Sequence, residues 1–138
     1  MSESGARSNL VKAMKCFDAI AVESPMTGIG IPDVNFTKGW IEVKWMRAWP
    51  RGADINPVKL DHTLSQEQKI WMNRRWRNGG LVLVAVQISR SWFFYNGGQI
   101  LTSNWWDNMS RPEMIRISEW NCSNGLDKEG LKKWINSL

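Results

Sequence analysis

The sequence predicts an α/β fold in which a mixed β-sheet is flanked by helices. The candidate elements follow one another as helix, strand, hairpin, helix, strand, strand. Apolar residues recur every three or four positions in the helical segments, and the continuous apolar run LVLVAVQI has the length of a strand covered on both faces. With 138 residues, the chain is expected to form one domain over residues 1–138.

The N-terminal part predicts a helix, a short strand and a hairpin. Residues 4–17 carry a helical apolar stripe made of Ala6, Leu10, Met14 and Phe17. Residues 19–22 (AIAV) predict a buried strand. Residues 31–36 and 40–45 alternate as strands do, and the Gly-containing segment 37–39 between them favours a β-hairpin.

The middle of the chain predicts a loop and then a helix. Residues 46–62 contain two prolines and four basic residues, which is typical of an exposed, basic loop. Ser65 lies three residues before Gln68, the spacing of a helix capping box. The helix that starts there is expected to stop at Gly79-Gly80.

The C-terminal part begins with two strands. Residues 81–88 predict a strand buried on both faces, and residues 91–98 predict an aromatic strand that ends in a turn. Residues 101–120 fit a short helix or an extended segment equally well. Residues 127–138 predict a terminal helix.

Composition favours a polyanionic partner and excludes several other classes. The formal net charge is +5, which suits nucleic acid. Cys16 and Cys122 are too few and too far apart for a disulfide framework or a zinc site. There is no apolar run of membrane-spanning length and the N-terminus is polar, so we expect no membrane partner and a cytoplasmic location, in the host if a phage encodes the chain.

The predicted hairpin carries three charged residues where apolar or neutral side chains are usual. Because side chains alternate along a strand, Glu42 and Lys44 share one face, and Asp33 on the paired strand can lie close to both. Two crowded carboxylates raise each other's pKa unless a cation lies between them. Such oxygen ligands suit Mg²⁺ or Mn²⁺, and the added lysine makes a phosphoryl-transfer site plausible. The alternative is an edge hairpin with exposed charges.

These residues resemble a known motif. Pro32-Asp33 followed by Glu42-Val43-Lys44 is similar to the PD-(D/E)XK nuclease motif. The segment LSQEQKIW, the glycine pair after it and the strand LVLVAV resemble the region that follows the active site in virus-type replication-repair nuclease (VRR-NUC) domains and archaeal Holliday junction resolvases. The resemblance covers about residues 3–95. Residues 96–138 are an extension that could form a wall of the site, a dimer contact or a substrate selector.

The resemblance implies a restriction-endonuclease-like fold and Mg²⁺-dependent hydrolysis of DNA, with Mn²⁺ able to substitute. It makes Asp33, Glu42 and the backbone carbonyl of Val43 metal ligands. It makes Lys44 the residue that activates the attacking water and stabilises charge on the phosphate. Gln68 would help to hold the water or the metal shell.

Further site residues are expected around this centre. Relatives often add a carboxylate from the first helix, and Glu3 falls near that position, although a frayed surface residue and a rival acid, Glu23, are alternatives. The loop ESPMTGIGIPD resembles the serine- and glycine-containing segment before the Pro-Asp in these families, which makes Ser24 a candidate for DNA binding. Three basic residues after the active-site strand are candidates for phosphate contacts: Arg47, Arg51 and Lys59.

The function expected from these features is a structure-specific DNA endonuclease, with a Holliday junction resolvase as the leading subclass. One site per chain means that symmetric cutting of a four-way junction requires two chains, so we expect a homodimer. A nickase or flap nuclease of the VRR-NUC kind and a restriction-like enzyme are alternatives within the enzyme class. A non-catalytic nucleic-acid-binding module is the alternative outside it.

Overall fold

The computed structural model describes residues 2–22, 30–102 and 106–138. Within these residues, six strands form one mixed sheet in the order β1-β2-β3-β4-β5-β6. The strands are β1 (Ile20–Ala21), β2 (Val34–Phe36), β3 (Gly39–Met46), β4 (Leu81–Ile88), β5 (Ser91–Asn96) and β6 (Trp120–Cys122). Strands β3 and β4 are parallel, and the other neighbouring pairs are antiparallel.

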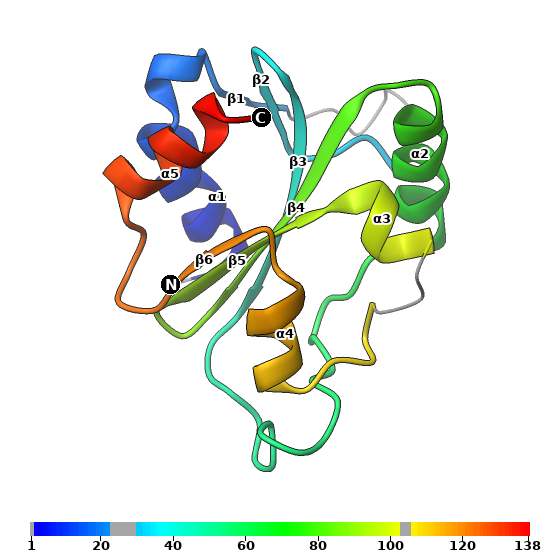
Figure 1. Ribbon diagram of the computed structural model, residues 1–138, viewed down its shortest axis with the longest axis vertical. Coiled ribbons are helices and arrows are strands. Elements are labelled where there is room, and N and C mark those ends of the chain that lie inside the picture. Colours follow the sequence, from blue (N-terminus) through cyan, green and yellow to red (C-terminus); the bar gives the residue numbers. More distant parts are fainter. Residues whose placement is uncertain (1, 23–29, 103–105) are drawn as a thin grey trace.

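Helices cover both faces of this sheet (Figure 1). They are α1 (Glu3–Ala13), the 3-10 helix η1 (Lys15–Phe17), α2 (Gln66–Arg77), α3 (Gly97–Thr102), α4 (Arg111–Ile117) and α5 (Lys128–Asn136). Helices α1 and α5 contribute to the core on one face, and α2, α3 and α4 contribute to the core on the other. The fold class expected from the sequence, a mixed α/β sheet flanked by helices, is therefore confirmed.

The two central strands have side chains in both cores. Val82, Val84 and Val86 of β4 pack on the α2 face, whereas Leu83 and Ala85 pack on the α1 face. This confirms that residues 81–88 form a strand buried on both sides.

Strand β3 alternates in the same way. Ile41 and Val43 point to the α1 face, and Met46 points to the α2 face. Glu42 and Lys44 therefore project from the α2 face, as the period of two predicts.

Two helices start as the sequence predicts. The apolar stripe of the first helix is buried throughout, in α1, the residue after it and η1. Ser65 is the N-cap of α2, and Gln68 completes a capping box with it. At the C-terminus, the Asp127 side chain caps α5.

Two predictions for the first strands were wrong in detail. Residues 19–22 do not form a buried strand, because β1 is a two-residue edge strand whose side chains are exposed, with Ile20 53% accessible. A short apolar run alone does not distinguish an exposed edge from a buried strand. The hairpin loop is also shorter than expected, because Phe36 pairs directly with Gly39.

The predicted exposed loop, residues 46–62, is partly buried. Ala53 and Val58 belong to the core on the α2 face. Backbone hydrogen bonds join this loop to the segment before α4, from the Val58 N–H to the Met109 carbonyl (2.8 Å) and from the Arg111 N–H to the Ala53 carbonyl (2.7 Å). The aromatic strand β5 leads into α3 rather than into a turn.

No helix in the described part of the chain has the length and apolar character needed to cross a membrane.

Replacing Gly39 with Ala should lower the free energy of unfolding by about 2 kcal/mol or more, because an added Cβ would lie 2.1 Å from the Leu81 carbonyl oxygen. This contact joins the start of β3 to β4 and so sets the register of the strand that carries Glu42 and Lys44. Urea unfolding monitored by circular dichroism measures the change. Gly79→Ala is the control, with open space around its Cβ and a cost of about 1 kcal/mol from its positive φ. Equal losses in both variants would contradict the close packing.

Candidate active site

The candidate site lies just beyond the Val34–Ile41 pair, where the pairing between β2 and β3 stops. The ladder between these strands runs from the Phe36–Gly39 pair to the Val34–Ile41 pair, while β3 continues to Met46 beside β4. Beyond Ile41, a side chain rather than a strand backbone binds this edge of β3: the Asp33 Oδ2 accepts a hydrogen bond from the Val43 N–H (3.1 Å). Because the N–H and carbonyl of one strand residue face the same edge, the Val43 carbonyl also lies on the Asp33 side.

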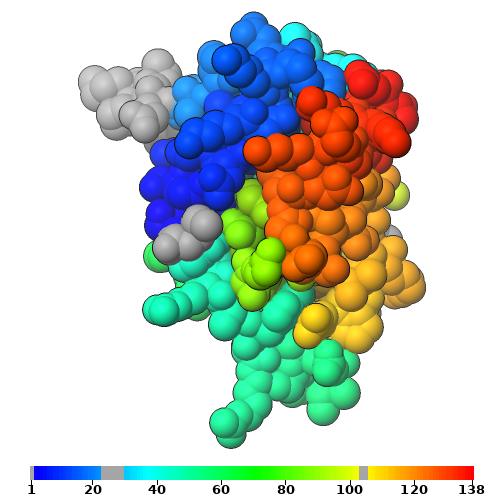
Figure 2. Space-filling model, turned by 90° about the vertical axis from the view of Figure 1, so that its left-hand side faces the viewer, coloured from blue at the N-terminus to red at the C-terminus, as the bar shows by residue number. Residues whose placement is uncertain are grey.

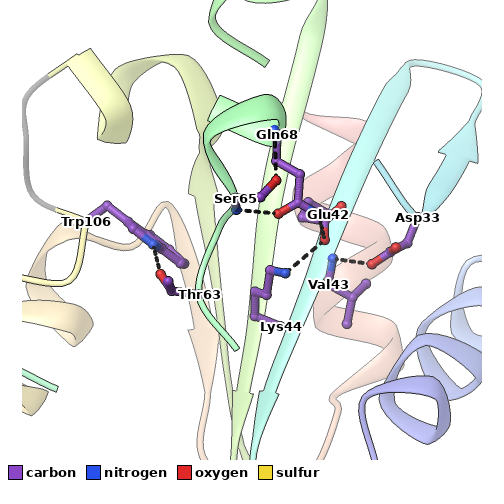
Figure 3. A network of polar contacts seen from close by, with 8 residues as sticks. All are labelled: Asp33, Glu42, Val43, Lys44, Thr63, Ser65, Gln68 and Trp106. Carbon is purple, nitrogen blue, oxygen red and sulfur yellow. Dashed lines mark hydrogen bonds and ion pairs between the residues drawn. The ribbon is translucent and has the colours of Figure 1, made fainter. Parts of the chain in front are cut away.

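Glu42 is at the centre of a small polar network on the α2 face (Figure 3). Its side chain is buried, with 1% of the residue accessible. Its Oε2 atom lies 3.3 Å from the Lys44 Nζ and accepts a hydrogen bond from the Gln68 Nε2 (2.9 Å). Its Oε1 atom is also buried and has no hydrogen-bond partner among the described residues. We call Asp33, Glu42, Lys44 and Gln68 the acid–lysine cluster.

The start of α2 fixes the orientation of Gln68. The Gln68 Oε1 accepts the Ser65 N–H (2.9 Å), and the Ser65 Oγ accepts the Gln68 N–H (3.1 Å). The amide oxygen is thus committed to the helix cap, which leaves the Nε2 group to donate to Glu42. One residue therefore serves both the capping box and the acid–lysine cluster.

Burial changes the acidity of this cluster. Desolvation, with a second contribution from the negative charge of Asp33, raises the pKa of Glu42 to about 8, and Lys44 opposes the change. Without a cation, Glu42 therefore holds a proton near neutral pH. A bound cation would favour the ionised form and displace that proton.

Glu3, at the first position of α1, lies beside the acid–lysine cluster. Partial burial raises its pKa, Lys44 acts in the opposite direction, and Asp33 adds to the increase. The nearby backbone N–H of Trp45 also acts to lower the pKa of this carboxylate. Its Oε2 atom is buried and has no hydrogen-bond partner among the described residues. Glu3 is thus not a frayed surface residue, whereas the rival acid Glu23 lies outside the described residues.

The oxygen atoms around Glu42 fit a hard divalent cation in part. Asp33, Glu42 and the Val43 carbonyl offer oxygen donors on neighbouring positions, and the unpartnered Glu42 Oε1 lacks the hydrogen bond that a buried acceptor normally has. In the described ranges, no three side chains of His, Cys, Asp or Glu come together as a metal-binding group. Glu3 therefore lies next to the two-carboxylate set rather than within it.

The predicted DNA-binding residues are distributed over a wider surface. Arg47 is exposed directly after β3, and Arg51 is exposed in the following turn. Lys59 is exposed too, and its Nζ donates to the Asp107 carbonyl, so it holds the loop to the segment before α4. Ser24 lies outside the described residues.

The contact of the Trp45 N–H with Glu3 was not foreseen from the sequence. The Asp33 side chain thus accepts one edge N–H of β3, and Glu3 lies near the next one along the same edge. A backbone donor has no sequence signature, and the contact depends on how α1 docks. The one indication was the shortness of β2, which leaves the next N–H groups of β3 without a strand partner.

Comparisons of the chain with protein-family models, with curated proteins and with solved structures found no match.

Without divalent metal, the free energy of unfolding should fall as the pH rises from about 4.5 to about 8. In this interval the folded chain keeps the Glu42 proton that the unfolded chain has lost, so folding is favoured below it and less favoured as the pH passes the folded pKa. The slope from this group is at most about 1.4 kcal/mol per pH unit. Urea unfolding in EDTA at several pH values measures it. Glu42→Gln should flatten the profile, and an unchanged slope would contradict the raised pKa.

Proposed function

We propose that the chain is a metal-dependent DNA endonuclease of the PD-(D/E)XK kind, with a restriction-endonuclease-like fold. The main support is the convergence of Asp33, Glu42 and Lys44 at the end of the β2–β3 ladder, with Glu42 buried and its Oε1 unpartnered. The mixed sheet flanked by helices agrees with the fold class that the motif implies.

A purely structural role accounts for part of this arrangement. Asp33 satisfies the Val43 N–H at an unpaired strand edge, which would suffice in a non-catalytic binding module. Glu42 and Lys44 have no such explanation, because burying two ionisable side chains in a sheet is costly and apolar residues of similar size serve stability as well or better. The buried pair therefore favours catalysis over the binding module.

Each residue has a separate task in the proposed reaction. A bound Mg²⁺ supplies charge stabilisation at the phosphate and increases the acidity of water. Asp33, Glu42 and the Val43 carbonyl hold the cation, and Gln68 keeps the Glu42 carboxylate in place. The Lys44 ammonium, 3.3 Å from Glu42, orients the attacking water and offsets negative charge on the phosphate.

The proposed substrate is branched DNA, with the four-way junction as the preferred form and two chains acting as a dimer. One acid–lysine cluster per chain cuts one strand, so paired incisions require a second copy. Mn²⁺ is expected to replace Mg²⁺, because both accept oxygen ligands.

Asp33→Asn should reduce cleavage of a synthetic four-way junction in Mg²⁺ by roughly 100-fold or more, since it removes the charge of a ligand. The asparagine oxygen can still accept the Val43 N–H, so the strand edge stays intact. Lys44→Met, which retains the bulk of the side chain, should have a similar effect. Gel analysis of the wild type and both variants on the junction, a linear duplex and a flap of equal length measures activity.

Paired symmetric cuts in the junction alone, lost in both variants, would support a resolvase. Equal cutting of all three substrates would retain the nuclease and remove junction preference. Tight binding by the wild type without cutting in Mg²⁺ or Mn²⁺ would overturn the proposed function in favour of the binding module.

Gln68→Ala should lower the cleavage rate by about 10- to 100-fold, because it releases the Glu42 carboxylate. It should also cost about 1 kcal/mol of stability through loss of the helix cap. Ser65→Ala is the matched control, since it removes the cap and leaves the Gln68–Glu42 bond in place. If both variants lose activity equally, Gln68 acts through the helix cap alone.

A further inference from the structure

A groove with a basic lining lies on the α1 face of the sheet, opposite to the face from which Glu42 and Lys44 project. Its volume is about 520 Å³, and α1, the sheet and the segment around the start of α5 line it. Figure 2 shows this side of the molecule: the β4–β5 turn around residue 90 lies between α1 and the C-terminal segment.

The floor of the groove is a row across three strands. Trp45 of β3 pairs in register with Gln87 of β4, and Gln87 pairs with Trp92 of β5, so the three side chains lie on one face. Gln87 is 6% accessible, and its amide nitrogen donates to the Ser89 carbonyl. Its Oε1 atom is buried and has no hydrogen-bond partner in the described part of the chain. The floor is therefore largely apolar, with one buried polar side chain, Gln87, at its centre.

The lining is strongly basic. Lys12 of α1, Arg47 after β3, Arg90 in the β4–β5 turn and Lys128 at the start of α5 all line the groove. A second hollow, which shares Lys12 and Lys128 with the first, continues the surface between α1 and α5. We call the two hollows together the basic groove.

The second hollow adds two further basic side chains and one acid. Lys15 and Lys132 line it, as does Glu129, which pairs with Lys132 at 3.4 Å. The basic groove thus has six basic residues against one acidic residue among those that line it.

Most of these charges are available to a ligand. The side chains of Lys12, Lys15, Arg47 and Lys128 are exposed, and none of the four has a hydrogen bond or ion pair to another described residue. Lys128 also sits in the first turn of α5, where a positive charge is unfavourable for the helix dipole. Its position thus has a stability cost that an anionic partner would offset.

The turn that contains Arg90 forms part of the wall of the groove. The Gly125 N–H donates to the Arg90 carbonyl (2.9 Å), and the Arg90 Nη2 donates to the Asn124 carbonyl (3.4 Å). Ser89 before it has a positive φ of 56°, an uncommon conformation for a serine. The turn and the β6–α5 loop therefore hold each other, and the C-terminal extension forms one wall of the groove.

Two elements connect the basic groove to the acid–lysine cluster. On α1, Glu3 and Lys12 are separated by about 14 Å along the helix axis. On β3, Lys44 and Arg47 are separated by about 10 Å. Lys44 and the groove are on opposite faces of the sheet, so DNA bound at both would pass around the end of β3. The phosphates of one strand repeat every ~3.4 Å along the duplex, so these separations correspond to roughly three or four nucleotides.

We propose that the basic groove binds the sugar–phosphate backbone of the DNA strand that flanks the scissile bond. This inference rests on the proposed function for its choice of DNA as the ligand. It assigns the C-terminal segment, through Lys128 and the loop that contacts Arg90, to substrate binding rather than to a dimer contact. The contacts are to phosphates, so affinity is expected to depend on salt and not on base sequence.

The test is the affinity of a fluorescently labelled four-way junction for the double variant Lys12→Glu/Lys128→Glu, measured by anisotropy in Ca²⁺, where binding proceeds without cutting. The control is Arg77→Glu/Lys133→Glu, which changes exposed basic residues at the C-terminal ends of α2 and α5. Each substitution lowers the net charge by two, so both double variants fall from +5 to +1. Thermal unfolding verifies that both are folded.

We expect the groove variant to bind at least about tenfold more weakly than the control. Its log–log plot of affinity against salt should be less steep than that of the wild type by about 1.8, the value for two lost phosphate contacts on duplex DNA. Equal affinity of the groove and control variants would overturn the proposal. So would a groove variant that loses binding to phosphatidylserine vesicles while keeping its affinity for the junction.

The same proteins, assayed for cleavage in Mg²⁺, separate this inference from the proposed function. If the wild type cleaves the junction and the groove variant binds and cleaves it equally well, the groove proposal is overturned and the nuclease proposal stands. If binding depends on the groove but the wild type does not cleave, the groove proposal stands and the nuclease proposal is overturned.

Discussion

The burial of one carboxylate, Glu42, constrains the rest of the site. It lies at 1% accessibility in the strand at the centre of the core, where solvent cannot satisfy it. Lys44 shares its face two residues along, and Gln68 reaches the same oxygen from the start of α2. The second oxygen has no such support within the described residues. Because burying these groups lowers stability, we interpret the site as one that binds a ligand.

The short β2 strand creates the opening for that ligand. Had β2 continued beside β3, its backbone would have bound the N–H groups of Val43 and Trp45. The Val43 N–H is instead bound by the Asp33 side chain, and Glu3, in the first turn of α1, lies near the Trp45 N–H. The edge of β3 is thereby closed to another strand, and two negative charges are concentrated beside Glu42. The same feature protects the sheet edge and builds the site.

Much of this arrangement follows from local sequence patterns. The alternation along β3 and the short hairpin place Asp33 near Glu42 and Lys44, and the spacing of Ser65 and Gln68 fixes the start of α2. Long-range packing explains what the sequence did not predict. The burial of Ala53 and Val58 depends on a segment some fifty residues later. The position of Glu3, which only the resemblance suggested, depends on how α1 docks. Both depend on contacts between distant segments, which periodicity does not encode.

The two charged surfaces are complementary in the proposed mechanism. The carboxylates of Asp33 and Glu42 would by themselves repel a phosphate, whereas the six basic residues of the basic groove attract one. A cation at the acid–lysine cluster would reverse the sign of the field there, so that both the cluster and the basic groove attract a polyanion. The raised pKa of Glu42 acts in the same direction, because protonation lowers the negative charge until a cation displaces the proton. On this argument the groove determines where the strand lies, and the buried carboxylate determines when it can be cut.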